Sequence, residues 1–356
     1  MSAALDKLET HPHQPLDPPT NVQNQSVHWV YATGVLAIHL LATLAFVPWF
    51  FSWAGVAVAL LGCYVFGTLG INLCYHRLLT HRGFRCPRWL EHGLAILGVC
   101  CLQDTPAHWV AVHRMHHRFS DQYPDPHSPL ANFFWGHMGW LLVQNKNLER
   151  MELYERYVKD LLRDRFYLTL ERGANWIWVN LAQWAVFYLT GFGIGYALSG
   201  QIMSGVQLGL SLLIWGVFLR TVLVWHITWS VNSVAHLWGY RNYETNEGSR
   251  NNIFVGLISN GEGWHNNHHA FPRSAAHGHR WWEFDVTYIT IRALAMLGLA
   301  KDVVLPKVLE RHHGVNSETH ITFTKVSIED VTAETTKLTT ADFPETEEQA
   351  ELPAAS

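Results

Sequence analysis

This chain of 356 residues contains 23 histidines, and their number and spacing indicate a chemical role. Nine gather in three short clusters and at one further position. The neutral imidazole is the commonest protein ligand for transition metals. The pattern therefore predicts a metal centre. Its members are His76-Arg-Leu-Leu-Thr-His81, His113-Arg-Met-His116-His117, His265-Asn-Asn-His268-His269, and His236, which follows Asn232 by four residues.

The spacing within the clusters predicts how the rings point. Residues at i, i+3 and i+4 share one face of a helix, so each HxxHH cluster is expected to aim three imidazoles at one point. His76 and His81 are five residues apart and do not share an α-helical face. They fit a helix end that unwinds, with each ring serving a different ion. Asn232 and His236 again have i, i+4 spacing.

The number of imidazoles predicts the number of ions. A first-row ion takes at most about six ligands and structural zinc takes four. Nine imidazoles therefore indicate two ions, with Asn232 contacting one of them through water. Imidazole suits Zn, Cu, Fe and Ni, so the ligands alone do not choose the metal. His39, inside an apolar stretch, is expected to be a packed and hydrogen-bonded residue.

Composition excludes several other kinds of protein. The net charge of -4 argues against a basic nucleic-acid binder. The five cysteines all lie between Cys63 and Cys101 and form no CxxC pair, which argues against a disulfide framework or a cysteine zinc site. Only 15% of residues are charged, against about 25% in an ordinary soluble protein.

Two long stretches without charge must position the histidines. Residues 18–76 and 173–219 contain no Asp, Glu, Lys or Arg. One crossing of a bilayer needs about 20 apolar residues, so each stretch has the length of a helical hairpin. The turns are expected at Pro48 to Trp53 and at Ser199 to Ser204. The fold class predicted is all-α integral membrane, with four transmembrane helices as two hairpins and a cytosolic helical cap that holds a His-rich dimetal site.

The loops predict the orientation and the domains. Lys and Arg are absent from both turns, but residues 74–173 carry thirteen and residues 228–313 carry eight. By the positive-inside rule these segments, the clusters and both termini are cytoplasmic. Trp89 to Leu102 is expected to be an interfacial helix, and residues 144–172 a solvated helix with many opposite-charge pairs. A polar N-terminal tail (1–27), a membrane domain (28–313) and an acidic, disordered C-terminal tail (314–356) complete the chain.

The clusters and the residues around them resemble segments of one protein family, both in sequence and in their order along the chain. HRLLTHRGF, HRMHHRFSDQYPDPH, NSVAHLWG and GEGWHNNHHAFP are similar to segments of the membrane fatty acyl desaturases of the delta-9 (stearoyl-CoA desaturase) type. The resemblance covers about residues 30 to 312. It implies a mushroom-shaped helical fold, with four transmembrane helices and a cytosolic cap. It also implies two Fe²⁺ ions, O2 as co-substrate and a cis double bond inserted into a saturated acyl chain. The implied ligands are His76, His81, His113, His116, His117, His236, His265, His268 and His269, with Asn232 through water.

The same resemblance implies a dry tunnel for the acyl chain, for which Trp109, Trp229, Trp264 and Tyr64 are candidates. Glu262 is expected to orient an imidazole. Animal acyl-CoA desaturases carry an Arg-Asp pair where this chain has Ala111-Val112. The acyl carrier therefore stays open among coenzyme A, acyl-carrier protein and a membrane phospholipid. The chain shows no haem-binding or CxxC module, so a separate ferredoxin-like or cytochrome b5-like protein is expected to supply two electrons.

Two other functions fit parts of this pattern. A membrane diiron hydroxylase or ketolase would share the metal centre but release an oxygenated lipid. A non-enzymatic metal transporter would place its ligands near the middle of its spans, whereas these clusters lie at span ends. A zinc hydrolase needs far fewer than nine histidines. We expect an acyl desaturase in a bacterial-type inner membrane in preference to the endoplasmic reticulum.

Overall fold

The computed structural model describes residues 26–306, which form helices and loops joined by isolated bridges. The prediction of an all-helical chain is confirmed. The predicted tails, 1–27 and 314–356, lie almost wholly outside the described residues. The longer helices are α1 (Trp29–Thr43), α2 (Trp53–Gly62), η4 (Cys63–Thr80), α3 (Arg88–Val99), α4 (Pro106–Phe119), α9 (Asn175–Ser199), α10 (Ile202–Leu213), α11 (Arg220–Leu237) and α14 (Val286–Met296). The shorter ones are η2 (Leu44–Phe46), η3 (Pro48–Phe50), η5 (Trp135–Gly139), α5 (Trp140–Leu142), η6 (Lys146–Leu148), α6 (Arg150–Tyr157), α7 (Lys159–Leu162), α8 (Arg165–Glu171), η7 (Ile214–Leu219), α12 (Ile253–Ile258) and α13 (His265–Ala270).

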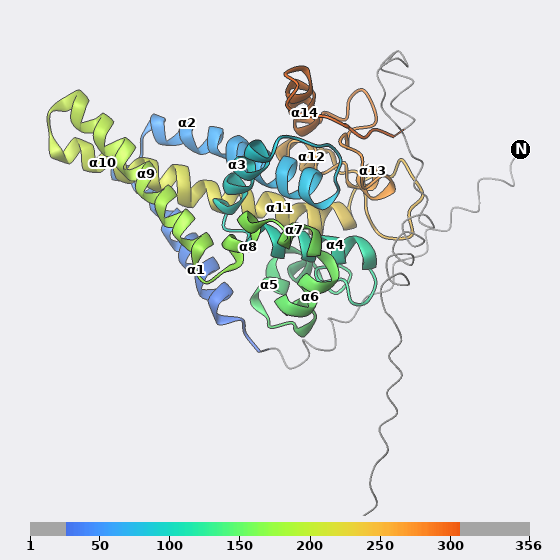
Figure 1. The fold of residues 1–356 in the computed structure, drawn as a ribbon. Helices are drawn as coiled ribbons and strands as arrows, with labels where there is room; N and C mark the ends of the chain where they lie inside the picture. Colours follow the sequence, from blue (N-terminus) through green and yellow to red (C-terminus); the bar gives the residue numbers. More distant parts are fainter. Residues whose placement is uncertain (1–25, 307–356) are drawn as a thin grey trace, which may run out of the picture. The chain divides into compact units, whose positions relative to one another are not determined.

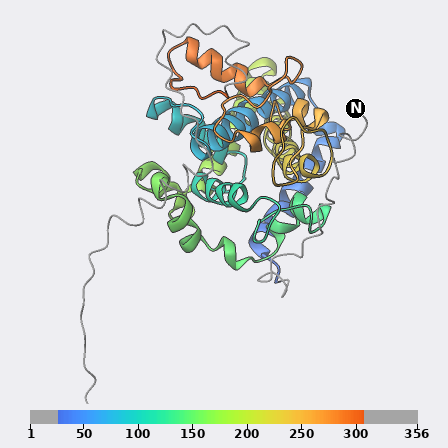
Figure 2. The same cartoon turned by 90° about the vertical axis from the view of Figure 1, so that its right-hand side faces the viewer.

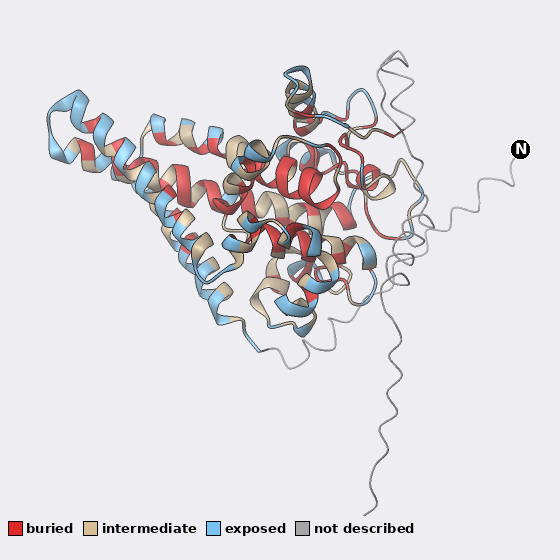
Figure 3. Cartoon of the chain, viewed as in Figure 1, coloured by how far each residue is buried: buried red, intermediate tan, exposed pale blue. Residues whose placement is uncertain are grey.

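Four helical stretches among the described residues are long and apolar enough to cross a membrane. They are Trp29–Phe46, Trp53–Thr80, Asn175–Ser199 and Ile202–Leu237. The breaks between them fall where the sequence predicts turns: η3 precedes α2, and Gly200 with positive φ separates α9 from α10. Figure 1 shows α9 and α10 running together to the turn at Gly200. In Figure 3 their outer faces are exposed, and these faces are apolar, as lipid contact requires.

The fourth span is longer than the sequence predicts. The second charge-free stretch ends at Leu219, but the helix continues through Arg220 to Leu237. The guanidinium faces protein and not lipid: it lies 4.4 Å from the centre of the Phe66 ring and donates to the Cys100 carbonyl at 3.0 Å. At 1.5 Å per residue the 36 residues are about 54 Å long, well beyond a hydrocarbon core of about 30 Å. His236 therefore lies far beyond the apolar half of the helix.

Glycines allow α9 and α10 to approach each other closely. A Cβ placed on Gly191 would lie 2.7 Å from the Leu208 carbonyl oxygen, and one on Gly195 would lie 2.5 Å from the Ser204 carbonyl oxygen. Both neighbours are backbone atoms, which cannot move aside without moving the helix. Small residues at such contacts are the usual means by which membrane helices pack, because lipid supplies no hydrophobic drive between them.

Gly191→Ala is therefore expected to destabilise the pair of helices by about 1–3 kcal/mol, the usual cost of inserting a methyl group into a filled contact. Gly193→Ala is the matched control, because a Cβ at Gly193 meets nothing within 4 Å. Thermal unfolding of both variants in detergent measures the difference. Equal midpoints for the two variants would contradict the close packing.

A second close approach sets the position of α3. A Cβ on Gly70 of η4 would lie 2.4 Å from the Gly98 backbone nitrogen of α3. The two helices thus touch backbone to backbone, and Leu94, Ala95 and Val99 are buried. α3 is too short to be a candidate span, as predicted. Its contact with η4 fixes the loop that leads to α4, the helix of the second histidine cluster.

The segment 144–172 is not the single solvated helix that its charges predict. It forms four short helices, η6, α6, α7 and α8, with a break at Val158 and a cap at Asp164. The segment is not wholly solvated either, because Val158 is fully buried and Leu161 almost so. Most of the ion pairs join different elements, as in Arg114 to Asp160 at 2.8 Å. The charges therefore hold α4 and α7 together.

Candidate metal centre

Five histidines converge in a first group that joins the end of η4 with α4 and α13. Their ligand nitrogens lie within 4.8 Å of one another. The Nε2 atom of His268 lies 3.1 Å from that of His76 and 2.9 Å from that of His117. All five side chains are buried or nearly so, which leaves few water molecules to compete. The members are His76, His81, His113, His117 and His268.

Four further histidines form a second group beside the first, from α4, α11 and α13. The Nε2 atom of His265 lies 3.0 Å from that of His236 and 3.0 Å from that of His269. The rings of His117 and His269, one from each group, are stacked with centres 4.6 Å apart. The two groups are therefore immediate neighbours. The members of the second are His116, His236, His265 and His269.

The prediction that each HxxHH cluster aims three rings at one point is wrong. His113 and His117 face the first group, whereas His116 between them faces the second. Each residue of an α-helix turns by about 100°, so i+4 lies about 40° to one side of i and i+3 about 60° to the other. The i and i+4 rings can meet, and the i+3 ring diverges from its neighbour by about 100°. The same geometry separates His268 from His265 and His269.

The prediction that His76 and His81 serve different ions is also wrong. Both belong to the first group, and their ring centres are 4.9 Å apart. Here η4 winds as a π-helix, and the His81 N–H donates to the His76 carbonyl at 3.2 Å, an i to i+5 bond. Residues five apart are successive turns of such a helix and share a face. Local π-winding at functional sites is a recurrent feature of helices.

Buried carboxylates hold the outer nitrogens of three of these rings. Each carboxylate accepts from an Nδ1–H, which leaves the Nε2 lone pair facing inward, the arrangement found behind most metal-bound histidines. Glu262 plays the orienting part that the sequence predicts, and sequence reasoning missed the other two. Their only signal is a position directly after the second cluster, in DQYPDPH. The pairs are His76 with Glu262 at 2.5 Å, His116 with Asp125 at 3.0 Å and His236 with Asp121 at 2.8 Å.

A buried arginine and a further histidine anchor this arrangement. Arg77 is fully buried, donates to Glu262 at 2.8 Å and pairs with Asp285 at 2.9 Å. His277 lies 3.2 Å from the other side of the Glu262 carboxylate. The carboxylate therefore has its partners fixed on three sides. Arg77 follows His76 directly, so the first cluster supplies both a candidate ligand and the anchor of its orienting group.

The donor set fits metal cations. Burial, reinforced by the neighbouring histidines, lowers the pKa of six of these rings well below the usual range, so these six are neutral at pH 7. Neutral rings whose Nε2 atoms lie about 3 Å apart cannot all satisfy one another, because each carries a single N–H. The Nε2 atoms of His81 and His116 have no hydrogen-bond partner among residues 26–306. The lowered groups are His81, His113, His117, His265, His268 and His269.

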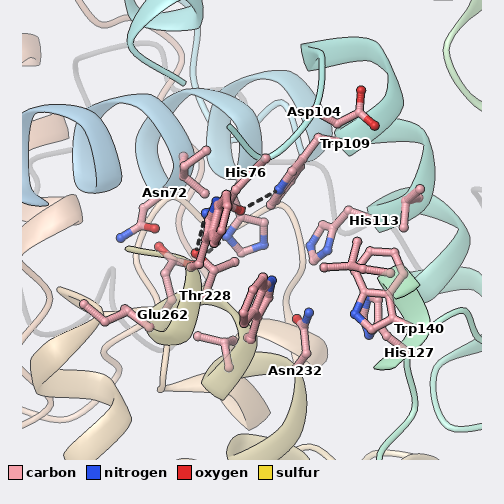
Figure 4. Close-up of a pocket in the computed structure, with 18 of the residues that line it drawn as sticks. Asn72, His76, Asp104, Trp109, His113, His127, Trp140, Thr228, Asn232 and Glu262 are labelled. Atoms are coloured by element: carbon pink, nitrogen blue, oxygen red, sulfur yellow. Dashed lines mark hydrogen bonds and ion pairs between the residues drawn. The ribbon is translucent and has the colours of Figure 1, made fainter. Parts of the chain in front are cut away.

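A mainly apolar cavity opens onto both groups. Figure 4 shows His76, His113 and Asn232 facing the same space from η4, α4 and α11. His265 of the second group also lines it. Asn232 belongs to neither imidazole group, but it faces the cavity at their edge. The cavity therefore has residues of both groups in its wall.

The candidate tunnel residues divide between this cavity and other places. Trp109 and Trp229 line it, whereas Trp264 is fully buried elsewhere, with its Nε1 donating to the Phe284 carbonyl at 2.9 Å. Tyr64 bonds Thr290 at 2.8 Å and is not in the cavity wall. Sequence reasoning did not single out most of the other wall residues, because nothing in their spacing marks them. Among them are Gln103, Trp140, Trp225 and Thr228.

Fold and site together define a class: an all-helical membrane protein with two adjoining buried imidazole groups beside an apolar cavity. Figure 2 turns the end that carries α4 and α13 toward the viewer. The model of the family described as fatty acid desaturase matches residues 51–295. The chain therefore belongs to the fatty acid desaturase family.

Individual relatives support this assignment over most of the chain. The sn-1 stearoyl-lipid 9-desaturase of Synechocystis sp. is 42% identical over 78% of this chain and 80% of its own length. The sn-2 palmitoyl-lipid 9-desaturase of Nostoc sp. is 38% identical over 83% of this chain and 97% of its own. The icosanoyl-CoA 5-desaturase of Limnanthes douglasii is 40% identical over 81% and 73%. The protein is an oxidoreductase that acts on acyl lipids or acyl-CoA, which confirms the predicted family and enzyme class.

Proposed function

We propose that the protein is an acyl-lipid 9-desaturase that inserts a cis double bond into a saturated acyl chain, using O2, a diiron centre and two electrons from a separate protein. The observation that carries this proposal is the cavity whose wall contains His76 and His113 of one imidazole group and His265 of the other. A chain bound there meets both groups at once. The relatives in Synechocystis and Nostoc are named as lipid 9-desaturases.

The proposed ligands are the nine histidines of the two groups, five for one ion and four for the other, with Asn232 contacting the second through water. Two iron ions bound there would supply the oxidant that removes hydrogen from an unactivated methylene, with O2 and the two electrons. Glu262, Asp121 and Asp125 keep the inward nitrogens unprotonated by accepting from the outer ones. Neutral imidazoles leave the ions their full positive charge, unlike the carboxylate shells of soluble diiron bundles.

The cavity wall positions the acyl chain and excludes water. Trp109 and Trp229 present flat apolar surfaces, and their place beside the groups makes them the proposed tunnel residues. Gln103 lies between them: it donates to Thr228 Oγ1 at 3.0 Å and accepts from Trp109 Nε1 at 3.3 Å. These bonds satisfy the polar groups of the wall among themselves, so the wall stays apolar toward the chain. Tyr64 and Trp264 act, in this proposal, from outside the cavity wall.

The proposed substrate is an acyl chain on a membrane glycerolipid. Ala111 is fully buried and Val112 lines the cavity, so neither offers a polar contact to a coenzyme A headgroup. The lipid 9-desaturases of Synechocystis and Nostoc support this carrier, whereas the icosanoyl-CoA 5-desaturase of Limnanthes douglasii is named for a coenzyme A thioester. Acyl-CoA and acyl-carrier-protein thioesters are the carriers that the experiment below must distinguish.

The proposed topology has two helical hairpins in the bilayer, with turns at Pro48 to Trp53 and Ser199 to Ser204. The histidine groups and both termini face the cytoplasm, in a cap formed around α4 and α13. The excess of Lys and Arg in residues 74–173 and 228–313 supports this orientation. A bacterial-type inner membrane is the proposed location. The residues proposed as the desaturase domain are 28–313.

Expression in a desaturase-deficient host is expected to yield new monounsaturated 16- or 18-carbon chains with the double bond at position nine. Gas chromatography-mass spectrometry with double-bond location, after separation of lipid classes, identifies the product. Short pulse-labelling shows whether the new double bond first appears in intact glycerolipid or in a thioester. The control is the same host without the gene, supplied with the same ferredoxin-like electron donor.

The possible products separate the alternatives. A hydroxylated or oxo lipid would replace desaturation by a hydroxylase or ketolase reaction. A double bond at another position would retain desaturation and overturn position nine. First appearance of label in acyl-CoA would overturn the lipid carrier alone. An unchanged profile, from membrane-inserted protein that holds two irons and has a working donor, would overturn the proposed reaction.

A further inference from the structure

Three histidines outside the two metal groups form a hydrogen-bonded chain of their own. The Nε2 atom of His39 in α1 lies 3.1 Å from the Nε2 atom of His226 in α11. The Nδ1 atom of His226 lies 3.0 Å from the Nε2 atom of His137 in η5. The central ring thus uses both nitrogens, on opposite sides. A single ion could not reach both contacts, so this chain has the geometry of a hydrogen-bond relay and not of a third metal site.

Both ends of the chain are closed by backbone carbonyls. His39 Nδ1 lies 2.7 Å from the Val35 carbonyl oxygen. At the other end His137 Nδ1 lies 2.9 Å from Ser233 Oγ, which bonds the Trp229 carbonyl at 2.8 Å. A carbonyl only accepts, so a hydrogen must point outward at each end. We call these four side chains, His39, His226, His137 and Ser233, the histidine array.

Counting hydrogens shows what the array can hold. Five contacts link the two carbonyls through the four side chains. Each neutral imidazole brings one N–H and serine brings one O–H, which makes four hydrogens. One contact therefore lacks a hydrogen in the neutral array, and one extra proton completes all five. The extra charge can sit on any of the three rings, because moving it only shifts each hydrogen along its contact.

The surroundings allow this proton to be taken up and released. Burial and the neighbouring His226 lower the pKa of His137 to about 4, so the array is neutral at rest and does not trap a proton. The rings pack against Trp225, Trp229 and Phe133, and no carboxylate, Lys or Arg among residues 26–306 is recorded in contact with them. A fixed negative charge beside them would hold the proton permanently.

The array lies directly behind the wall of the substrate cavity. Trp225 and Trp229, which its rings contact, line that cavity. Its inner end, Ser233, is fully buried and follows Asn232, another wall residue. The three rings are only partly buried. The array therefore runs from three partly buried rings to a fully buried hydroxyl at Ser233, the residue that follows Asn232.

We propose that the histidine array is a proton relay that passes protons one at a time to the desaturase reaction through Ser233. The proposal rests on the proposed function, because that reaction consumes protons. Reduction of O2 to two waters takes four electrons and four protons. The acyl chain supplies two of each as two C–H bonds break and the C=C bond forms, and the one-electron donor protein supplies two electrons. The remaining two protons must come from solvent, and the array passes them on in turn, taking up one and releasing it before the next enters.

Ring ¹⁵N resonances of metal-free protein labelled at histidine test the array without any turnover. His39→Gln, His137→Gln and His226→Gln assign the signals. The wild type is expected to show His226 and His137 averaged between the two tautomers, because the missing hydrogen moves along the chain, while His39 stays the Nδ1–H tautomer. Ser233→Ala removes one hydrogen and two contacts, so three hydrogens then fill three contacts in a single arrangement. It is expected to show fixed tautomers at His226 and His137, and fixed tautomers at these two rings in the wild type would overturn the relay.

Turnover of the iron-loaded enzyme gives the second test. His226→Gln keeps hydrogen-bonding capacity but cannot carry the proton, and is expected to lower kcat about tenfold, which is about 1.4 kcal/mol of barrier. The solvent deuterium isotope effect on kcat is expected to rise, while KM and iron content stay unchanged. The matched control is His92→Gln, since His92 is also a partly buried ring but contacts Asp164 and Phe166. An unchanged isotope effect would overturn the role in the reaction, and a wild type that never desaturates would overturn the proposed function instead.

Discussion

Desaturation is expected to be lost when His268 is replaced by alanine, while the protein still inserts into the membrane. His268 Nε2 lies 3.1 Å and 2.9 Å from the Nε2 atoms of His76 and His117, so its ring is central to the first imidazole group. Losing one ligand in five removes several kcal/mol of metal-dependent catalysis, which at 1.36 kcal/mol per factor of ten is at least about 1,000-fold in rate. Product analysis and iron per protein measure the two consequences.

The same change at His117 is expected to have the same effect, because it also faces the first group and stacks on His269 of the second. His92→Ala is the matched control: it removes a partly buried ring far from both groups and is expected to keep its iron and activity. Membrane extraction followed by gel filtration confirms that each variant is inserted and folded. Wild-type turnover in His268→Ala or His117→Ala would break the ligand assignment.

The membrane spans could be predicted from the sequence because a charged side chain in lipid is costly, so a long stretch without charged residues marks a span. The end of the second charge-free stretch, before Arg220, is not the end of the fourth helix. A prediction of spans from runs without charges assumes that each charged side chain faces lipid or water. Arg220 does neither, because the Phe66 ring and the Cys100 carbonyl cover it. Burial inside protein follows from packing among helices far apart in the chain. Burial of Val158 within the charged segment 144–172 has the same cause.

The sequence predicted which histidines belong to the site, but not how they divide between the two groups. Nine histidines were identified from spacing and resemblance, and all nine lie in two adjoining groups. How they divide depends on helix rotation and on π-winding at the end of η4, which brings His76 and His81 together. The charged partners were harder still. Asp121 is 115 residues from His236 in the chain, so only the fold shows that they meet.

The orienting network behind the first group is the second place where one substitution should have a large effect. Glu262→Gln keeps the shape of the side chain and removes its charge. Burial opposes the charge, but Arg77, His277 and His76 hold the pKa of this carboxyl well below its usual range, so it is ionised at neutral pH. Its loss leaves fully buried Arg77 with Asp285 as its remaining carboxylate partner. Breaking a buried ion pair in this way costs about 3–5 kcal/mol.

Glu262→Gln is expected to lower the affinity for the metal as well as the stability of the fold. In Glu262→Gln the amide NH2 group that faces His76 is a donor, and it meets the Nδ1–H of the ring, which is also a donor. The ring therefore loses the carboxylate oxygen, 2.5 Å away, that fixes its tautomer. Loss of such a partner typically lowers metal affinity about 10- to 100-fold. Iron retained during titration with a chelator measures the affinity, and thermal unfolding in detergent measures the stability. Glu244→Gln, at an exposed glutamate, is the matched control. If Glu262→Gln kept both its iron and its unfolding midpoint, Glu262 would be neither the orienting group of His76 nor the counter-charge of Arg77.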